Sequence, residues 1–305
     1  MAKIAQFNAN GGWHFYFLKD RKMQVKTILV ADSGSTKTDW CLVEDGHRRT
    51  FSTQGISPYF QTPAQVQEII QTELVRQYPA LLQVHELYFY GTGLLAPANA
   101  RMVEDALQAV FTQTNISVNH DLMGAARGLC GRHPGVVSIL GTGSNSCFYD
   151  GITIVKNNPG LGYVLGDEGS GAYLGKRLLQ YYLYDSFDEE LKFKFDAKYQ
   201  VTRDQILENV YRKPLANRYL ASFAGFLTEN RGHFLIENAL EDGINEFFFN
   251  HLYKYRESWT SPLYFSGGIA HAFRDVIQTL CELYELQLGT IVRSPLEGLV
   301  NFHGE

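Results

Sequence analysis

The stretch that decides the fold runs from Ile28 to Asp39 and reads ILVADSGSTKTD. Its first four residues are an apolar run typical of a buried strand, and the run ends at a small, polar loop around Gly34. A second apolar run at residues 40–43 follows the loop and ends at the turn dipeptide Asp45-Gly46. The sequence therefore predicts two strands that are joined by a loop rich in glycine, serine and threonine.

The same order returns 109 residues later, counted from Gly34 to Gly143. An apolar strand at 136–140 leads into a glycine loop at 141–145, and a second strand at 146–149 ends at another Asp-Gly pair. A third junction of this kind lies where residues 263–265 run into a Ser-Gly-Gly turn. A duplicated α/β unit explains this repeated order of strands and glycine loops, and chance similarity is the alternative.

Periodicity places further elements between and after these loops. Short strands are expected at 87–90 and 116–119, and helices at 65–76 and 99–111. The later half is rich in helical patterns, which cover 172–184, 202–211, 217–226 and a long stretch at 233–255.

Length and composition bound the class of protein. The 305 residues are enough for two domains, and 27 basic against 32 acidic residues give a formal charge of −5. A protein that grips nucleic acid usually has a basic excess, and no run approaches the roughly 20 apolar residues that span a membrane. The four cysteines form no C-x-x-C pair. We therefore expect a cytoplasmic protein with reduced thiols, no nucleic-acid partner and no membrane.

Residues 1–25 are unlike the rest of the chain. A six-residue apolar run follows Gly11-Gly12 and precedes a charged Lys-Asp-Arg-Lys cluster, so it is too short for a signal-peptide core. The preferred interpretation is an extra N-terminal segment with Met23 as the true start, and the alternative is an additional edge strand.

The loop after the first strand has the chemistry of a phosphate site. Glycine lets backbone N–H groups approach a phosphate, the neighbouring hydroxyls add donors, and Lys37 adds a positive charge. Asp32, at the strand end, could hold hydrated magnesium. An ordinary hairpin turn is the alternative. The spacing fits neither the P-loop nor the Rossmann fingerprint.

Two later positions carry carboxylates in suggestive contexts. Asp121 lies where a short strand meets a helix start, a place from which it could accept a proton from a hydroxyl. A plain helix N-cap is the alternative there. The run from Gly160 to Gly171 is dense in glycine, and its Asp167 and Glu168 could accept hydrogen bonds from sugar-type hydroxyls. Helix capping before Ala172 is the alternative for these two.

Five motifs in order resemble one known family. They are DSGSTKT at 32–38, Asp121, GTGSN at 141–145, the run GLGYVLGDEGS at 160–170 and SGG at 266–268. In this combination the chain resembles the N-acetylglucosamine kinase / BadF-BadG-BcrA-BcrD ATPase family, part of the actin-like ATPase and sugar-kinase superfamily. The resemblance covers roughly Ile28 to the C-terminus.

The resemblance implies an α/β fold of two ribonuclease-H-like lobes, the duplicated actin/hexokinase-like fold, with an interlobe cleft. ATP would bind in the cleft and the sugar deeper in. The lobes would span 26–120 and 121–292, with a C-terminal helix at 293–305 rejoining the first lobe, and residues 1–25 would lie outside both. A homodimer is left open.

The same resemblance implies roles for individual residues. Asp121 would be the general base on the 6-hydroxyl of an amino sugar, and magnesium would bind near Asp32. The residues implied for ATP are Gly34, Ser35, Thr36, Lys37, Thr142, Gly143, Gly267 and Gly268. The residues implied for the sugar, besides Asp121, are Ser57, Ser144, Asn145, Gly160, Leu161, Gly162 and Asp167.

Ser57 is a departure from the family, because the kinases supply an asparagine from the corresponding segment. Serine is shorter and lacks the paired donor and acceptor of an amide. The departure leaves the identity of the sugar open. N-acetylglucosamine is the predicted substrate, with N-acetylmuramic acid or glucosamine as alternatives. An ATPase that activates a radical dehydratase or reductase is a further alternative, although Cys130 and Cys281 lack a cluster-binding motif. A degenerate sugar-binding regulator would need a damaged loop or a lost base, and the sequence has neither.

Overall fold

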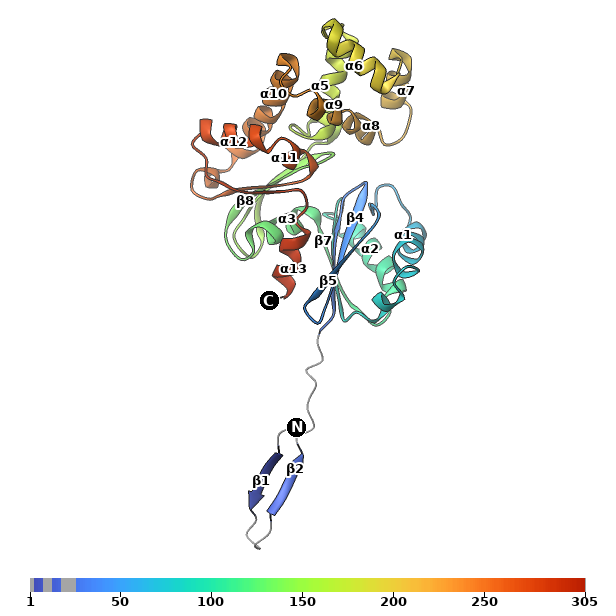
Figure 1. Ribbon diagram of the computed structural model, residues 1–305, viewed down its shortest axis with the longest axis vertical. Coiled ribbons are helices and arrows are strands. Elements are labelled where there is room, and N and C mark those ends of the chain that lie inside the picture. The colour runs from blue at the N-terminus through green and yellow to red at the C-terminus, as the bar shows by residue number, and fades with distance from the viewer. Residues whose placement is uncertain (1–2, 8–12, 18–25, 305) are drawn as a thin grey trace.

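Two five-stranded sheets organise the chain (Figure 1). The computed structural model describes residues 3–7, 13–17 and 26–304. The sheets have the strand orders β5-β4-β3-β6-β7 and β10-β9-β8-β11-β12, which are the same order twice. In each sheet three antiparallel strands are continued by two parallel ones. The two-lobed, duplicated α/β fold expected from the repeated loops is confirmed.

The first sheet is built around β3, whose apolar residues are covered on both faces, as expected for a central strand. The strand β5, which pairs with β4, was not predicted, because it is an edge strand and its first four residues are exposed and polar. The turn between β4 and β5 is the predicted Asp45-Gly46, and both residues have positive φ. The strand bounds are β3 Ile28–Ser33, β4 Lys37–Glu44, β5 His47–Gln54, β6 Glu86–Gly91 and β7 Asn115–His120.

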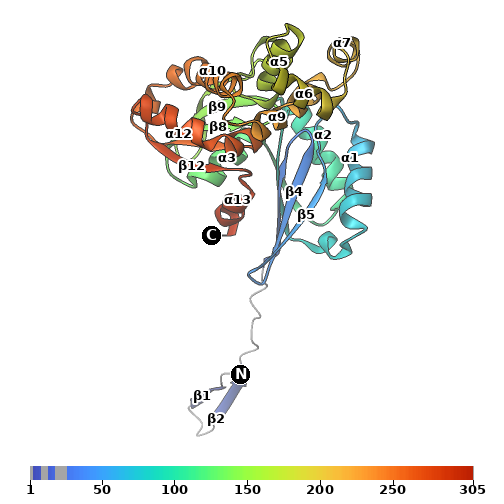
Figure 2. The same ribbon diagram turned by 45° about the horizontal axis from the view of Figure 1, so that its top comes forward.

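Helices cover one face of this sheet and pack on Leu29, Trp40 and Phe89 (Figure 2). Thr62 begins the first helix with a capping box shared with Gln65. The single helix predicted at 65–76 is wrong in one respect, since an α-helix passes into a π-helical segment after Ile69. The bounds are α1 Pro63–Ile69, η1 Ile70–Val75, η2 Pro79–Gln83 and α2 Pro97–Val110.

The second sheet is covered by a larger, aromatic-rich set of helices that includes α5, α10 and α12. The strand bounds are β8 Gly135–Leu140, β9 Ser144–Tyr149, β10 Ile154–Asn158, β11 Leu263–Ser266 and β12 Leu288–Val292. The helix bounds are α4 Gly162–Leu165, α5 Gly171–Leu183, α6 Glu189–Tyr199, α7 Arg203–Tyr211, α8 Ala216–Ser222, α9 Ala224–Glu229, α10 Phe234–Asn250, η3 Leu252–Lys254, η4 Arg256–Trp259, α11 Gly268–Ala272 and α12 Arg274–Leu283.

Two helix predictions in this lobe need correction. The pattern at 217–226 forms two helices, because the chain breaks at Phe223 between α8 and α9. The long pattern at 233–255 forms a helix only as far as Asn250, and a short 3-10 turn follows. The hydrophobic spacing correctly predicted helical structure in both places, but it does not predict the residue at which a backbone turn ends a helix.

Helices α3 Asp121–Cys130 and α13 Leu296–Gly304 lie between the two sheets. The apolar side of α3 packs on Val137, Cys147 and Tyr149 of the second sheet. Leu299 and Val300 of α13 pack on the first sheet. The chain therefore leaves the first lobe through α3, and its last helix returns to that lobe's sheet.

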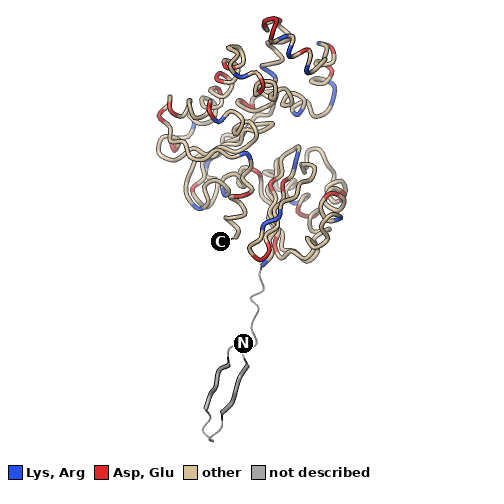
Figure 3. The backbone as a smooth tube through the Cα atoms, in the orientation of Figure 1, with Lys and Arg blue, Asp and Glu red and all other residues tan. Residues whose placement is uncertain are grey.

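The N-terminal segment contributes β1 Lys3–Phe7 and β2 Trp13–Phe17, which pair with each other as a separate two-stranded sheet. Neither strand joins a five-stranded sheet, so the alternative of an additional edge strand is wrong. The start proposed at Met23 lies outside the described residues. Within the described ranges, no helix has both the length and the apolar character needed to cross a membrane. Charges of both signs are spread over the two lobes (Figure 3).

Candidate active site

In the first lobe, three parallel strands bring the predicted residues to one edge. The strand register aligns Ser33, Gly91 and His120 at the carboxyl ends of β3, β6 and β7. The residues that follow each strand, including Gly34, Thr92 and Asp121, consequently meet there. The Thr92 amide donates to the carbonyl of Ser33 at 3.0 Å, which ties two of these ends together. Carboxyl ends of parallel strands are where α/β sheets commonly bind ligands.

The loop between β3 and β4 is a tight turn whose backbone is accessible. The amide of Gly34 donates to the carbonyl of Lys37 at 2.9 Å, and Gly34 and Thr36 are exposed. Gly55 presses against this turn, because a Cβ at position 55 would lie only 2.4 Å from the Gly34 carbonyl oxygen. The Lys37 ammonium lies 2.7 Å from the Asp39 carboxylate, so its charge is paired within the lobe. The turn thus offers backbone and hydroxyl donors, as a phosphate loop does.

Asp121 is the first residue of α3, and the N-cap is His120, whose ring accepts from the Met123 amide at 3.4 Å. The alternative that Asp121 is a plain N-cap is therefore wrong. Its carboxylate accepts from the Leu122 amide at 2.8 Å and from the Thr92 side chain. Burial raises the pKa of Asp121 to about 6. A carboxylate with a pKa close to neutral is suited to accept a proton.

Asp32 lies close enough to Asp121 for their charges to interact. Burial and the charges of Asp121 and Asp39 raise the pKa of Asp32 to about 6, against the opposing effect of the Ser294 hydroxyl, which donates at 2.7 Å. A surface hollow of about 660 Å³ lies between β4, β5 and the start of α13, and Lys37, Asp39 and Ser294 are among the residues that line it, whereas Asp32 and Asp121 are not.

This carboxylate pair fits a magnesium ion. Mg²⁺ characteristically uses one or two carboxylates, water and substrate phosphates instead of a dedicated protein cage. The described residues hold no cluster of three or more His, Cys, Asp or Glu side chains. The expected magnesium site takes only Asp32 from the chain. The bound cation would offset the repulsion between the two carboxylates.

In the second lobe, three other predicted sugar residues and Gly143, a predicted ATP residue, lie around the Asp167 carboxylate. One oxygen accepts from the Gly162 amide at 2.9 Å, and the Ser144 amide donates to the same group. The backbones of Gly143 and Gly160 lie against it, since a Cβ at either position would be 2.8 Å from an Asp167 oxygen. Burial raises the pKa of Asp167, and Asp167 itself has a positive φ of 60°.

The second glycine loop is held differently from the first. The first two amides of α5, those of Gly171 and Ala172, donate to the carbonyls of Gly141 and Thr142 at 2.8 and 3.0 Å. Gly267 lies against the same loop, because its Cβ would be 2.2 Å from the Leu140 carbonyl oxygen. Thr142, Gly143 and Gly267 therefore lie together at the carboxyl ends of β8 and β11, and Gly268 begins α11.

Three remaining sugar candidates differ in accessibility. The Asn145 side-chain oxygen is engaged by the Ser146 amide and by Asn157, at 2.9 and 3.0 Å. Leu161 is 63% exposed. Ser57 is 1% exposed, and its hydroxyl has no hydrogen-bond partner among the described residues. The Ser144 hydroxyl is also buried without such a partner. Each of these two hydroxyls is available to bond a water molecule or a ligand group.

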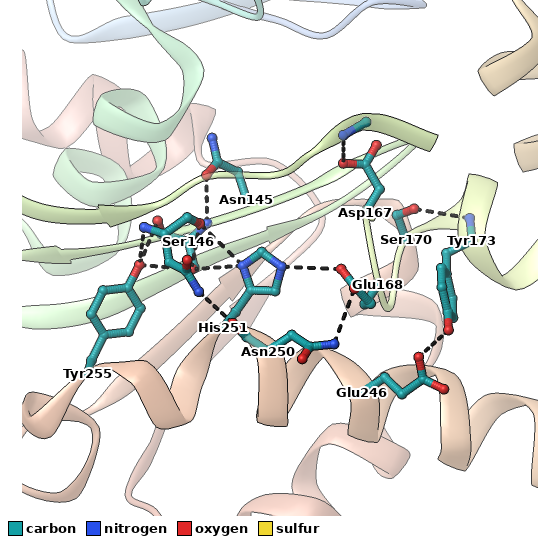
Figure 4. A network of polar contacts seen from close by, with 12 residues as sticks. Asn145, Ser146, Asp167, Glu168, Ser170, Tyr173, Glu246, Asn250, His251 and Tyr255 are labelled. Carbon is teal, nitrogen blue, oxygen red and sulfur yellow. Dashed lines mark hydrogen bonds and ion pairs between the residues drawn. The ribbon is translucent and has the colours of Figure 1, made fainter. Parts of the chain in front are cut away.

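Glu168 does not share the environment of Asp167. Its side chain is directed toward the end of α10, where it contacts Asn250 and His251 (Figure 4). The interpretation that both adjacent carboxylates accept from a sugar is therefore corrected for Glu168. Helix capping does not explain either residue, because the N-cap of α5 is Ser170.

The predicted residues thus form two groups, one at the sheet edge of each lobe. Across the described part of the chain, hydrogen bonds join members within a group but none joins a member of one group to a member of the other. Sequence reasoning missed Gly55, Thr92 and Ser294. The Gly-Thr-Gly sequence after β6 was a usable signal for Thr92, whereas nothing local marks Ser294, which is 262 residues from Asp32.

Comparison with protein families agrees with this geometry. The model of the BadF/BadG/BcrA/BcrD ATPase family matches residues 31–240, which include both glycine loops, Asp121 and the Asp167 segment. The chain belongs to the BadF/BadG/BcrA/BcrD ATPase family. Members of this family use ATP. No curated protein matches the chain significantly.

Several solved structures share the fold of this family member. A candidate N-acetylglucosamine kinase from Porphyromonas gingivalis is 38% identical with a TM-score of 0.85, over 90% of this chain and 98% of that one. A second candidate N-acetylglucosamine kinase, from Chromobacterium violaceum, is 19% identical with a TM-score of 0.71, over 91% and 99%. A non-polymerising mutant of MamK bound to AMPPNP has a TM-score of 0.55 at 11% identity, over 92% and 99%. The last two support the fold alone.

Proposed function

We propose that this chain transfers the γ-phosphate of ATP to the 6-hydroxyl of an amino sugar, with N-acetylglucosamine as the first substrate. The observation that carries the proposal is Asp121, a carboxylate with a pKa near 6 at the same sheet edge as a phosphate-type loop. The 38% identity to a candidate N-acetylglucosamine kinase supports this choice of sugar. We also propose a cytoplasmic location, because the proposed reaction takes its phosphate from ATP.

The ATP side of the proposed site is made by the two glycine loops. Gly34, Ser35, Thr36 and Lys37 in one lobe, with Thr142 and Gly143 in the other, would hold the phosphates, and Gly267 and Gly268 would line the adenosine pocket. This division assigns residues 26–120, with the returning helix α13, to one lobe and residues 121–292 to the other. Asp32 would hold magnesium, whose charge would neutralise the phosphates when bound.

The sugar side would use Ser57 and Asp121 in the first lobe and the Asp167 cluster in the second. In the proposed step, Asp121 takes the proton of the 6-hydroxyl, the oxygen bonds to the γ-phosphorus, and the bond to the leaving ADP breaks. Most of the rate enhancement comes from positioning and from charge stabilisation by the two loops. Ser144, Asn145 and the backbone of Gly160, Leu161 and Gly162 would hold the remaining hydroxyls and the acetamido group.

A substrate screen tests the proposal. ADP production by the purified full chain is measured with N-acetylglucosamine, N-acetylmuramic acid, glucosamine, N-acetylmannosamine and glucose, with Asp121→Asn as the control. We expect turnover on N-acetylglucosamine that Asp121→Asn lacks, and a 6-phosphate in the product by NMR. Faster turnover of another amino sugar would replace N-acetylglucosamine as the assigned substrate.

ATP hydrolysis that no sugar stimulates would overturn the kinase proposal in favour of the ATPase activator. That alternative needs cysteines available between subunits. The structure buries Cys130 and Cys281, which are 5% and 1% exposed. An iron-containing dimer after anaerobic purification would be its signature.

A further inference from the structure

Two adjacent carboxylates at the end of the glycine-dense segment are turned in opposite directions (Figure 4). Asp167 has a left-handed φ of 60°. This backbone conformation costs free energy in residues that have a side chain, so it persists only where the surrounding structure stabilises it. This conformation directs its carboxylate to the amides of Gly162 and Ser144. The next residue, Glu168, extends to the other side and reaches α10.

Glu168 is held by the last residue of α10 and by the residue after it. The Asn250 amide donates to one carboxylate oxygen at 3.1 Å, and the other oxygen lies 3.5 Å from Nε2 of His251. The Glu168 side chain is 18% exposed, so the contact is largely shielded from water. Two neighbouring residues therefore grip one carboxylate.

His251 is itself fixed on its other side. Its Nδ1 lies 3.2 Å from the Asn158 carbonyl oxygen and 3.3 Å from the Ser146 hydroxyl, and its ring stacks on Phe247. A carbonyl oxygen only accepts, so Nδ1 carries the proton in that contact. Tyr255 completes the network, since its hydroxyl accepts from the Asn158 amide at 2.6 Å. The anchor of Glu168 thus rests on β9, β10 and α10 together.

We propose that Glu168 is a positioning residue, which holds Asp167 in its left-handed conformation through the contacts of Glu168 with Asn250 and His251. The inference rests on the proposed function only in taking Asp167 to be a sugar ligand. Glu168 touches no predicted substrate residue directly through its carboxylate. Its effect on a reaction would come through the direction of the Asp167 side chain.

The replacement of Glu168 separates positioning from a direct role of charge. Nε2 bonds the Glu168 carboxylate only when it carries a proton, so with Nδ1 protonated toward Asn158 the wild-type contact uses the imidazolium form of His251. With glutamine at position 168, a neutral His251 presents a lone pair at Nε2, to which the glutamine amide can donate. Glu168→Gln also keeps an oxygen for Asn250 and should preserve the anchor. Glu168→Ala removes both contacts. Glu246→Ala is the matched control, because Glu246 also bonds from α10 to another element of the second lobe, through Tyr173 and Arg177 of α5, but it does not bond Asp167 or Glu168.

The first measurement needs no substrate and no activity. Hydrogen exchange of the full chain without ligands should show at least tenfold faster exchange at the Gly162 amide in Glu168→Ala, because Asp167 would release it. The Gln variant and Glu246→Ala should stay within about twofold of the wild type. Unchanged protection of Gly162 in Glu168→Ala would overturn the inference. Because Glu168→Ala could fail to fold, Asn250→Ala serves as a second variant, with a smaller change in the same direction.

The second measurement is a kinetic split on the sugar identified by the screen. Glu168→Ala should raise the sugar KM at least fivefold while kcat and the ATP KM change less than twofold, and Glu168→Gln should restore the sugar KM. A Gln variant as impaired as the Ala variant would overturn positioning in favour of a direct charge. If the wild type phosphorylates no sugar, the proposed function fails, and the exchange experiment still decides the inference.

Discussion

The two glycine loops of this protein occupy equivalent places in equivalent sheets, yet they are held by different means. The loop at Gly34 is pressed from outside by Gly55, and its own amide closes the turn on Lys37. The loop at Gly143 is fixed by the first amides of α5 and by Asp167. The first keeps exposed donors, whereas the second is continuous with a carboxylate cluster.

The carboxylates follow the same division. Asp32 and Asp121 lie within charge-interaction range at the first sheet edge, and burial raises both pKa values to about 6. Asp167 in the second lobe is bonded by backbone amides. The same scaffold therefore occurs twice, with two raised-pKa carboxylates beside the first loop and one carboxylate bonded by backbone amides beside the second.

The largest expected effect on activity comes from the carboxylate pair of the first lobe. Asp121→Asn should lower kcat on the order of 10²–10⁴-fold if the proton transfer is lost. Its melting temperature should rise, because an amide avoids the cost of ionising a buried carboxyl. The steady-state rate and a thermal melt check both. Asp150→Asn, at the exposed hairpin turn of the second lobe, is the control and should retain normal turnover. Near-normal turnover in Asp121→Asn would falsify its assignment as the base.

A second pair of variants breaks each loop separately. In Gly55→Ala the new methyl group would lie 2.4 Å from the Gly34 carbonyl oxygen, and in Gly160→Ala 2.1 Å from that of Ser144. Overpacking of this kind costs about 1–3 kcal/mol, so each loop must shift. We expect Gly55→Ala to raise the ATP KM and Gly160→Ala the sugar KM, both by roughly tenfold or more.

Gly225→Ala is the control for both glycine variants, since no atom lies within 4 Å of the added Cβ. It should leave both KM values unchanged. The comparison of the lobes would be wrong if Gly55→Ala and Gly160→Ala raised the same KM and left the other alone.

The pH dependence should move activity and stability in opposite directions. The base must be ionised, so kcat/KM should fall about tenfold per pH unit below an apparent pKa near 6, which belongs to the Asp32 and Asp121 pair. Both groups bind protons more tightly when folded, so they make the folded state less stable as pH rises from about 4 to about 6.

Rate profiles and melts between pH 4.5 and 8, at roughly half-unit steps, check this opposition. Asp121→Asn should reduce the slope of stability with pH in the same window. A rate that rises toward low pH would contradict the proposed base.

The smallest effect concerns the two buried hydroxyls without partners, Ser57 in one lobe and Ser144 in the other. If each binds the sugar, Ser57→Ala and Ser144→Ala should each raise the sugar KM by a few fold, as expected for a hydrogen bond of about 0.5–1.5 kcal/mol. Melting temperatures should hold or rise slightly, because an unpaired buried hydroxyl is removed. A change in only one variant would show that a single lobe binds the sugar, and lower stability with unchanged KM would show a structural role.

Local pattern predicted the central strands and the outer strand β7, but it missed the outer strands β5, β10 and β12. β3 and β8 are apolar runs covered on both sides, so hydrophobicity alone identifies them. β5 and β10 are edge strands with exposed, polar residues and form because a neighbouring strand offers free hydrogen-bonding groups. Helix α6 was missed for a related reason, since only Leu191 and Phe195 of its residues are buried.

The site divides in the same manner. Asp121, the two glycine loops and Asp167 were named from short motifs, because each is a local departure of the chain from regular structure. The contacts that set their chemistry come from elsewhere, as when Ser294 bonds Asp32 or Gly55 packs on the first loop. The neighbouring carboxylates Asp167 and Glu168 could not be told apart in sequence, because their difference lies in backbone direction.

The sequence by itself determined the repeated strand–loop–strand unit, the family and the polar residues at the strand ends, since these follow from local composition and order. Only the tertiary structure decided which of those residues meet. It brought Asp32 within charge range of Asp121, raised both pKa values by burial, and turned Glu168 away to His251. Proximity and desolvation depend on segments that are far apart in the chain, and for that reason no local pattern contains them.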